Sequence, residues 1–161
     1  MNFLEKLFGH KPQTREEKVA YAMGVIHEVG TRLGRKYGQN NIMKYLAIYS
    51  AGEYMRESLE SGDFEADTDN YQGSKCQTRL RKHLEIGITN LVTNGLDDTS
   101  ADAQIRSRFS YFEKIALDAT IDFISTNRKK NPDIPAFLTA LRMFYDLAEA
   151  EMKKGFRSTQ T

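Results

Sequence analysis

Asp118 and Asp122 are the one pair of acids in the sequence whose spacing suits acid–base chemistry. They lie four residues apart in an apolar stretch, so a helix would place both carboxylates on one side, one turn apart. Two enclosed carboxylates at that spacing raise each other's pKa, as a general acid requires. They are also the only polar interruption on that half of the stretch. We therefore expect an exposed or arginine-paired strip in preference to a catalytic pair.

Other catalytic and metal-binding patterns are missing from the sequence. The three histidines, His10, His27 and His83, are far apart, and none lies three residues after an acid, as a di-iron bundle requires. A single cysteine, Cys76, cannot form a thiolate zinc site, and there is no glycine-rich phosphate loop or Gly-x-Ser-x-Gly motif. The sequence thus predicts no catalytic residue, metal or cofactor, and it favours a protein that is not an enzyme. A catalytic site assembled from distant residues stays open as an alternative.

A second set of residues suits binding: His27, Gly30, Gly34, Tyr45 and Tyr49. Each glycine inside a helix costs about 0.8–1 kcal/mol relative to alanine, so a close contact should offset this cost. The structural interpretation is a neighbouring helix packed against the small residues, and the tyrosines then belong to the core. The functional interpretation is a small molecule held between the first two long helices, beside His27 and the tyrosine rings.

A basic stripe begins the helix expected after residue 74. Lys75, Arg79 and Lys82 share one side of it, whereas Arg81 points elsewhere. The preceding acidic loop, residues 62–73, carries acids at alternate positions but lacks the glycine and glutamate of a calcium loop. We expect the stripe to pair with this loop or with an acidic patch on a protein partner. We also expect no useful nucleic-acid binding, because the loop would repel a polyanion.

We expect the stretch 105–124 to form the central helix, against which the rest of the chain packs. One apolar stripe follows steps of three and four, and a second runs along the other side. The first stripe contains Ile105, Phe109, Phe112, Ala116, Ala119 and Phe123, and the second contains Leu117, Ile121 and Ile124. A helix with two apolar sides must be covered from two directions.

Helix start and stop signals divide the rest of the chain. Capping boxes at Thr14 and Ser74 and a capping asparagine at 40 or 41 predict three helix starts. Pro132 and Pro135 mark the turn into the last helix. No segment alternates with the period of a strand. The predicted fold is therefore all-α, a single-domain bundle of five long helices plus a short N-terminal amphipathic helix.

Composition agrees with one domain over residues 1–161, since 40% of the residues are hydrophobic and 28% are charged. Within it we expect an N-terminal arm at residues 1–12, the acidic loop at 62–73 and a frayed tail at 155–161. The apolar residues of the arm must dock on this chain, on a partner or on a membrane surface.

The formal net charge of +1 gives no general attraction to nucleic acid or membranes. No run approaches the roughly 18 apolar residues of a membrane span. With one cysteine and no secretory signal, the sequence suggests a soluble, cytoplasmic protein. The leading functional hypothesis is a non-enzymatic helical module that binds another protein or, as a homodimer, a second copy of itself.

Overall fold

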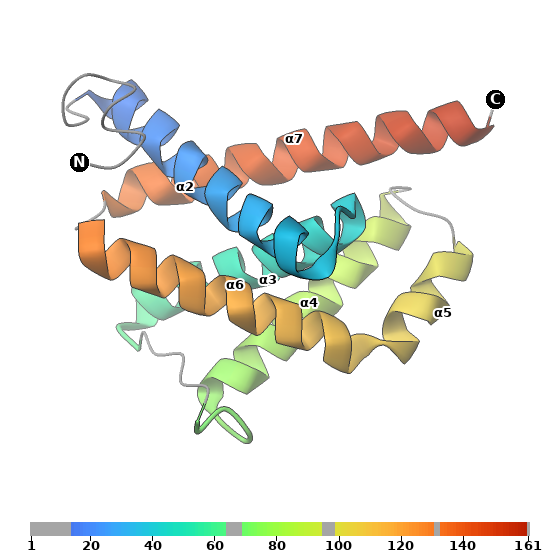
Figure 1. Cartoon of the computed structure of the whole chain (residues 1–161), viewed down its shortest axis with the longest axis horizontal. Coiled ribbons are helices and arrows are strands. Elements are labelled where there is room, and N and C mark those ends of the chain that lie inside the picture. Colours follow the sequence, from blue (N-terminus) through green and yellow to red (C-terminus); the bar gives the residue numbers. More distant parts are fainter. Residues whose placement is uncertain (1–13, 64–68, 95–98, 131–132, 161) are drawn as a thin grey trace.

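The computed structural model describes residues 14–63, 69–94, 99–130 and 133–160. The described residues form six helices and no strand, so the predicted all-α bundle is confirmed. Figure 1 shows how these helices are arranged. The helices are α2 (Arg15–Tyr37), α3 (Asn41–Ser61), α4 (Lys75–Thr93), α5 (Thr99–Ser107), α6 (Phe109–Lys130) and α7 (Ile134–Gln160). The predicted N-terminal arm and the centre of the acidic loop lie outside the described residues.

The helices begin where side chains satisfy the first free backbone N–H groups. Thr14 Oγ1 accepts a hydrogen bond from Glu17 N at 3.1 Å, and Ser74 Oγ accepts one from Gln77 N at 3.1 Å. Asn40 caps α3 through Met43 N, and Asp133 Oδ1 caps α7 through Ala136 N at 2.9 Å. Such caps stabilise a helix by about 1 kcal/mol each. The starts of α2, α3 and α4 are those that the sequence predicts.

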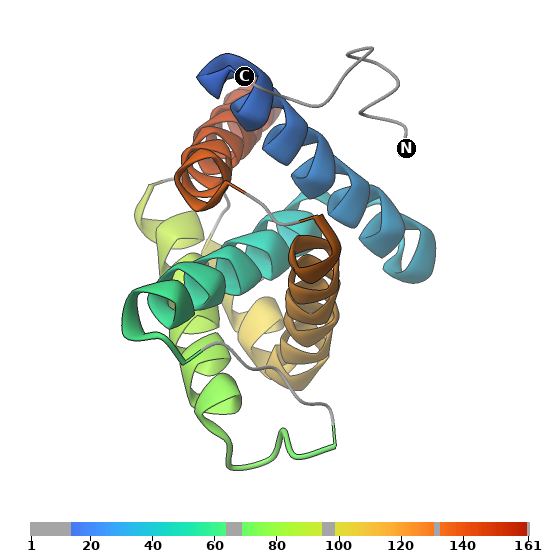
Figure 2. The ribbon, with the colours of Figure 1, turned by 90° about the vertical axis from the view of Figure 1, so that its left-hand side faces the viewer.

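The central helix of the bundle is α3, and the prediction that residues 105–124 form it is wrong. Helices α2, α4, α6 and α7 all pack against α3, and Figure 2 shows it running through the middle of the bundle. The sequence obscures this because small residues, which carry little apolar signal, let the neighbouring helices approach α3. Buried small residues of α3 are Ala47, Ser50, Ala51, Gly52 and Ser58.

The stretch 105–124 is also divided between two helices. Helix α5 ends at Ser107, and α6 starts at Phe109. Arg108 lies in a turn between them, and its N–H donates to Ile105 O. No proline or glycine marks this break. The apolar residues keep their helical spacing across it, so the sequence predicts one continuous helix. The first predicted stripe still faces the interior: Ile105, Phe112, Ala116, Ala119 and Phe123 are buried, and Phe109 is partly buried.

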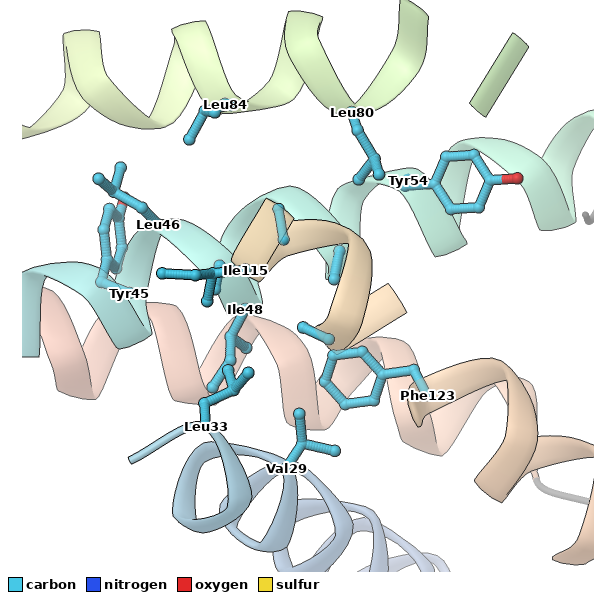
Figure 3. Close-up of a cluster of buried hydrophobic side chains, with 14 of the residues drawn as sticks. Val29, Leu33, Tyr45, Leu46, Ile48, Tyr54, Leu80, Leu84, Ile115 and Phe123 are labelled. Carbon is cyan, nitrogen blue, oxygen red and sulfur yellow. The ribbon is translucent and has the colours of Figure 1, made fainter. Parts of the chain in front are cut away.

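The core lies where α6, α2 and α4 meet α3. Figure 3 shows Val29 and Leu33 of α2 facing Ile48 of α3, with Phe123 of α6 beside them. The Phe123 ring packs edge-to-face on Phe137 of α7, at a centroid distance of 5.6 Å. Burying a large apolar side chain contributes about 1.5–3 kcal/mol, so these contacts stabilise the packing of α2, α3, α6 and α7.

Helix α7 continues past the position near Lys154 at which the sequence places its end, and it runs to Gln160. Its first half crosses α2, and Figure 1 shows its second half running on beyond that crossing. In the part of the chain that the structure describes, no helix combines the length and apolarity needed to cross a membrane.

Candidate functional site

The structure does not bring the predicted ligand-binding residues together. The side chain of His27 is exposed. Gly30 faces Ile48, and a Cβ atom placed on Gly30 would lie 3.5 Å from that side chain, an ordinary contact. Gly34 is covered by Gln39, whose amide nitrogen would lie 2.6 Å from such an atom, and not by a neighbouring helix. These glycines therefore border no shared space with the two tyrosines.

Tyr45 and Tyr49 instead face α7, where they form a cluster with Tyr145. The rings of Tyr45 and Tyr49 stack at 5.6 Å, and those of Tyr49 and Tyr145 lie 5.0 Å apart. The Tyr45 hydroxyl donates to Glu149 at 2.8 Å, and burial raises the pKa of Tyr45. Tyr45 and Tyr49 thus pack in the core, as in the structural interpretation of the sequence, and Tyr145 of α7 is the partner that the sequence did not identify.

The closest approach of helices in this cluster occurs at Gly52. A Cβ atom there would lie 2.2 Å from the Tyr145 hydroxyl oxygen and 2.9 Å from Leu141. The same hydroxyl is buried without a hydrogen-bond partner among the described residues, and burial raises the pKa of Tyr145. Gly87 of α4 also lies close to α3, since a Cβ atom there would lie 3.2 Å from Leu46. Close contacts between helices at a glycine thus occur at Gly52 and Gly87, whereas the close neighbour of Gly34 on α2 is the side chain of Gln39 in the connection to α3.

The basic stripe is engaged within the molecule. Asp63, at the start of the acidic loop, forms ion pairs with Lys75 at 3.2 Å and with Arg79 at 3.6 Å. Arg79 Nη1 also donates to the backbone oxygen of Asp63. Lys82 pairs with Glu57 of α3 at 2.9 Å. Both predicted binding residues of this stripe therefore have acidic partners on the same chain.

Glu57 also meets His83, at 2.6 Å between Oε2 and Nε2. His83 is 5% exposed, and its Nδ1 atom is buried without a hydrogen-bond partner among the described residues. Burial lowers the pKa of His83 below its ordinary 6.5, and the hydrogen bond that the ring makes to the Glu57 carboxylate opposes this only in part. Lys82, which also lowers it, and Glu53 are the other charged groups that act on the ring.

We expect the free energy of unfolding to fall as the pH drops below about 6.5, because unfolded His83 takes up a proton more readily than folded His83. The loss should continue down to the lower pKa of the folded state. Urea titrations between about pH 7 and about pH 5 measure this slope. His83→Gln should flatten it, whereas His27→Gln, at an exposed position, should keep it. If the His83→Gln variant keeps the pH dependence of the parent protein, His83 is not its source.

A second polar cluster surrounds Glu113 of α6, which is 5% exposed. Its Oε2 atom accepts hydrogen bonds from Tyr71 at 2.7 Å, Arg81 at 3.0 Å and Gln77 at 3.3 Å. Burial acts to raise the pKa of Glu113, but these hydrogen bonds outweigh it and lower the pKa. Glu113 lies four residues after Phe109 and three before Ala116, so it falls directly beside the predicted core stripe. That charged residue on an apolar face was the available signal for a buried acid.

Asp118 and Asp122 border an open groove of about 380 Å³ between α2 and α6. Arg32 Nε donates to Asp122 at 2.7 Å, and Lys36 Nζ donates to Asp118 at 3.0 Å. The Tyr37 hydroxyl donates to the same Asp118 oxygen. Each acid thus has its own cation, which is the paired strip that the sequence favours and not a general acid–base pair.

The outer side of α7 carries two of the four large apolar side chains that are exposed among the described residues. We call Arg142, Met143, Asp146, Leu147 and Ala150 the α7 outer face. Leu147 is 59% exposed and Met143 is 43% exposed, one helical turn away. Arg142 and Asp146 are also exposed, and neither forms an ion pair with another described residue. This face has apolar and charged groups that the rest of the described chain does not cover.

Within the described ranges, no three His, Cys, Asp or Glu side chains lie close enough together to hold a metal ion. Comparisons with models of known protein families, with curated proteins and with solved structures find no match to this chain.

Proposed function

We propose that the protein is a non-enzymatic helical module that binds another protein through the α7 outer face. The observation that carries this proposal is the exposure of Met143 and Leu147, one turn apart on the same helix. Large apolar side chains at this spacing are the anchors by which one helix recognises another or enters a groove. A partner that covers both side chains would remove apolar area from water, which favours association.

The opposite side of α7 supports this role because it holds the helix firmly on the bundle. Phe137, Leu141 and Tyr145 are buried against the neighbouring helices. The α7 outer face is therefore presented on a preorganised element, and little conformational entropy is lost when it binds. Arg79 and Glu113 form ion pairs within the chain, so these two residues support a structural role and not a binding role.

The proposal can be tested with a photo-crosslinking amino acid placed at Leu147, and with the same amino acid at Ile86 as the matched control. Ile86 on α4 is 41% exposed, so it samples a similar environment outside the α7 outer face. We expect an adduct with one defined protein, identified by mass spectrometry, from position 147 only. Met143→Asp should reduce its yield about tenfold, which corresponds to about 1.4 kcal/mol.

Equal adducts from positions 86 and 147 would contradict the proposal, as would a yield that Met143→Asp leaves unchanged. Circular dichroism of each variant checks that the helices are retained, so that a lost adduct reports on the surface and not on unfolding.

A further inference from the structure

We infer that the α7 outer face binds a second copy of this chain, with the two α7 helices antiparallel across a two-fold axis. This inference rests on the proposed function, since it names the partner of the same surface. Two observations carry it: the spacing of the apolar pair, and the arrangement of the unpaired charges beside that pair.

The apolar pair is self-complementary under this symmetry. A two-fold axis that passes perpendicular to α7 near residue 145 exchanges the positions of residues 143 and 147. Met143 of one subunit then lies against Leu147 of the other, and the same contact occurs twice, as an isologous interface requires. Both side chains are largely exposed in the single chain, so both are accessible for this contact.

The charges follow the same symmetry. Arg142 and Asp146 are four residues apart, so they lie on the same side of the apolar pair. In two antiparallel helices, residues on the same side face each other across the interface. An axis near residue 144, within one residue of the apolar centre, therefore places Arg142 beside Asp146 of the other subunit, and this pair also forms twice.

The charge arrangement also distinguishes this partner from others. In a parallel pair of α7 helices, residues on one side of the seam face residues on the other side, so Arg142 would not meet Asp146 of the second copy and neither charge would be paired. A uniformly acidic or basic helix would pair with only one of the two charges. A second antiparallel copy pairs both, and the formal net charge of +1 causes little repulsion between two chains.

The interface involves few large side chains, so we expect a dissociable dimer. Stable complexes bury about 1,200–2,000 Å² in total, and one pair of crossing helices provides less than this range. The association should therefore depend on concentration in the micromolar range, and the monomer should remain folded because its core does not include the α7 outer face.

Sedimentation equilibrium of the purified full chain tests the inference, at concentrations from about 10 to about 500 µM. We expect the average mass to rise from monomer towards dimer across this range. Arg142→Asp and Asp146→Arg should each weaken the dimer at least tenfold. The matched control Lys114→Asp reverses an exposed charge on α6 and should leave the dimer unchanged.

The decisive measurement mixes the two weakened variants. The chain with Arg142→Asp carries two acids on this side of α7, and the chain with Asp146→Arg carries two arginines, so an antiparallel heterodimer regains both ion pairs. We expect the equimolar mixture to dimerise within about threefold of the parent, although neither variant dimerises alone. Combining both substitutions in one chain should also restore the dimer.

A chain that stays monomeric at every concentration would overturn the inference, as would a mixture that stays monomeric. These results differ from a failure of the proposed function. A monomer whose position 147 still crosslinks to a different protein, in a manner that depends on Met143, removes the second copy as partner and leaves the surface itself supported.

Discussion

Glu113→Ala is expected to lower the free energy of unfolding by about 2–5 kcal/mol, the largest effect of any single substitution proposed for this chain. The carboxylate is buried and accepts three hydrogen bonds. Without it, the Tyr71 hydroxyl and the Gln77 amide each lose an acceptor while they remain buried, at about 1–3 kcal/mol apiece. The Arg81 side chain is 51% exposed, so it can turn to water at little cost. Urea denaturation measures the change.

Glu85→Ala is the matched control, because Glu85 is also a helical glutamate paired with an arginine, Arg106. Its side chain is 50% exposed, so its loss should cost at most about 1 kcal/mol. Adding Tyr71→Phe to Glu113→Ala should recover part of the loss, because the hydroxyl left without an acceptor is removed. Equal effects at the two glutamates would show that burial of Glu113 does not matter.

Gly52→Ala is expected to destabilise the protein by about 1–3 kcal/mol, although alanine is the better helix former. The added Cβ atom would lie 2.2 Å from the Tyr145 hydroxyl and 2.9 Å from Leu141, and both side chains are buried, so moving them aside disturbs core packing. The matched control is Gly30→Ala, another buried glycine within a helix. Its Cβ atom would make an ordinary 3.5 Å contact with Ile48, so Gly30→Ala should be neutral or stabilise by up to about 1 kcal/mol.

The cause of the Gly52 effect can be isolated with Tyr145→Phe. That substitution removes a hydroxyl that has no hydrogen-bond partner among the described residues, so it should change the stability little by itself. Combined with Gly52→Ala, it should recover more than half of the loss, because the closest clashing atom is gone. A double variant as unstable as Gly52→Ala would assign the clash to Leu141 or to the backbone.

The helix starts could be predicted from the sequence because each depends on atoms a few residues apart. Thr14 and Ser74 cap their helices through backbone N–H groups three residues later. The turn into the last helix, which Pro132 and Pro135 predict, likewise depends on local backbone preferences. Asp118 and Asp122 were expected to be paired and are, because two acids on an otherwise apolar face need solvent or cations.

Local reasoning of this kind cannot show whether the residues predicted to bind a ligand lie together. Gly30 and Tyr45 lie on neighbouring helices, but the direction in which each points depends on how α2 and α7 are placed around α3. Gly30 faces Ile48, whereas Tyr45 reaches Glu149, which is 104 residues further along the chain. The small residues that mark a close helix contact are informative only when the facing helix is known.

The sequence by itself determined that the chain is helical, where α2, α3 and α4 begin, and which side of the stretch 105–124 faces the core, because caps and periodicity act within one or two turns. The tertiary structure decided that α3 is central, that Gly52 is the close contact, and that Glu113 is buried with three donors. It also decided that Met143 and Leu147 of α7 stay exposed. These features depend on contacts between residues distant in the chain, where packing in three dimensions selects among faces that look equivalent in the sequence.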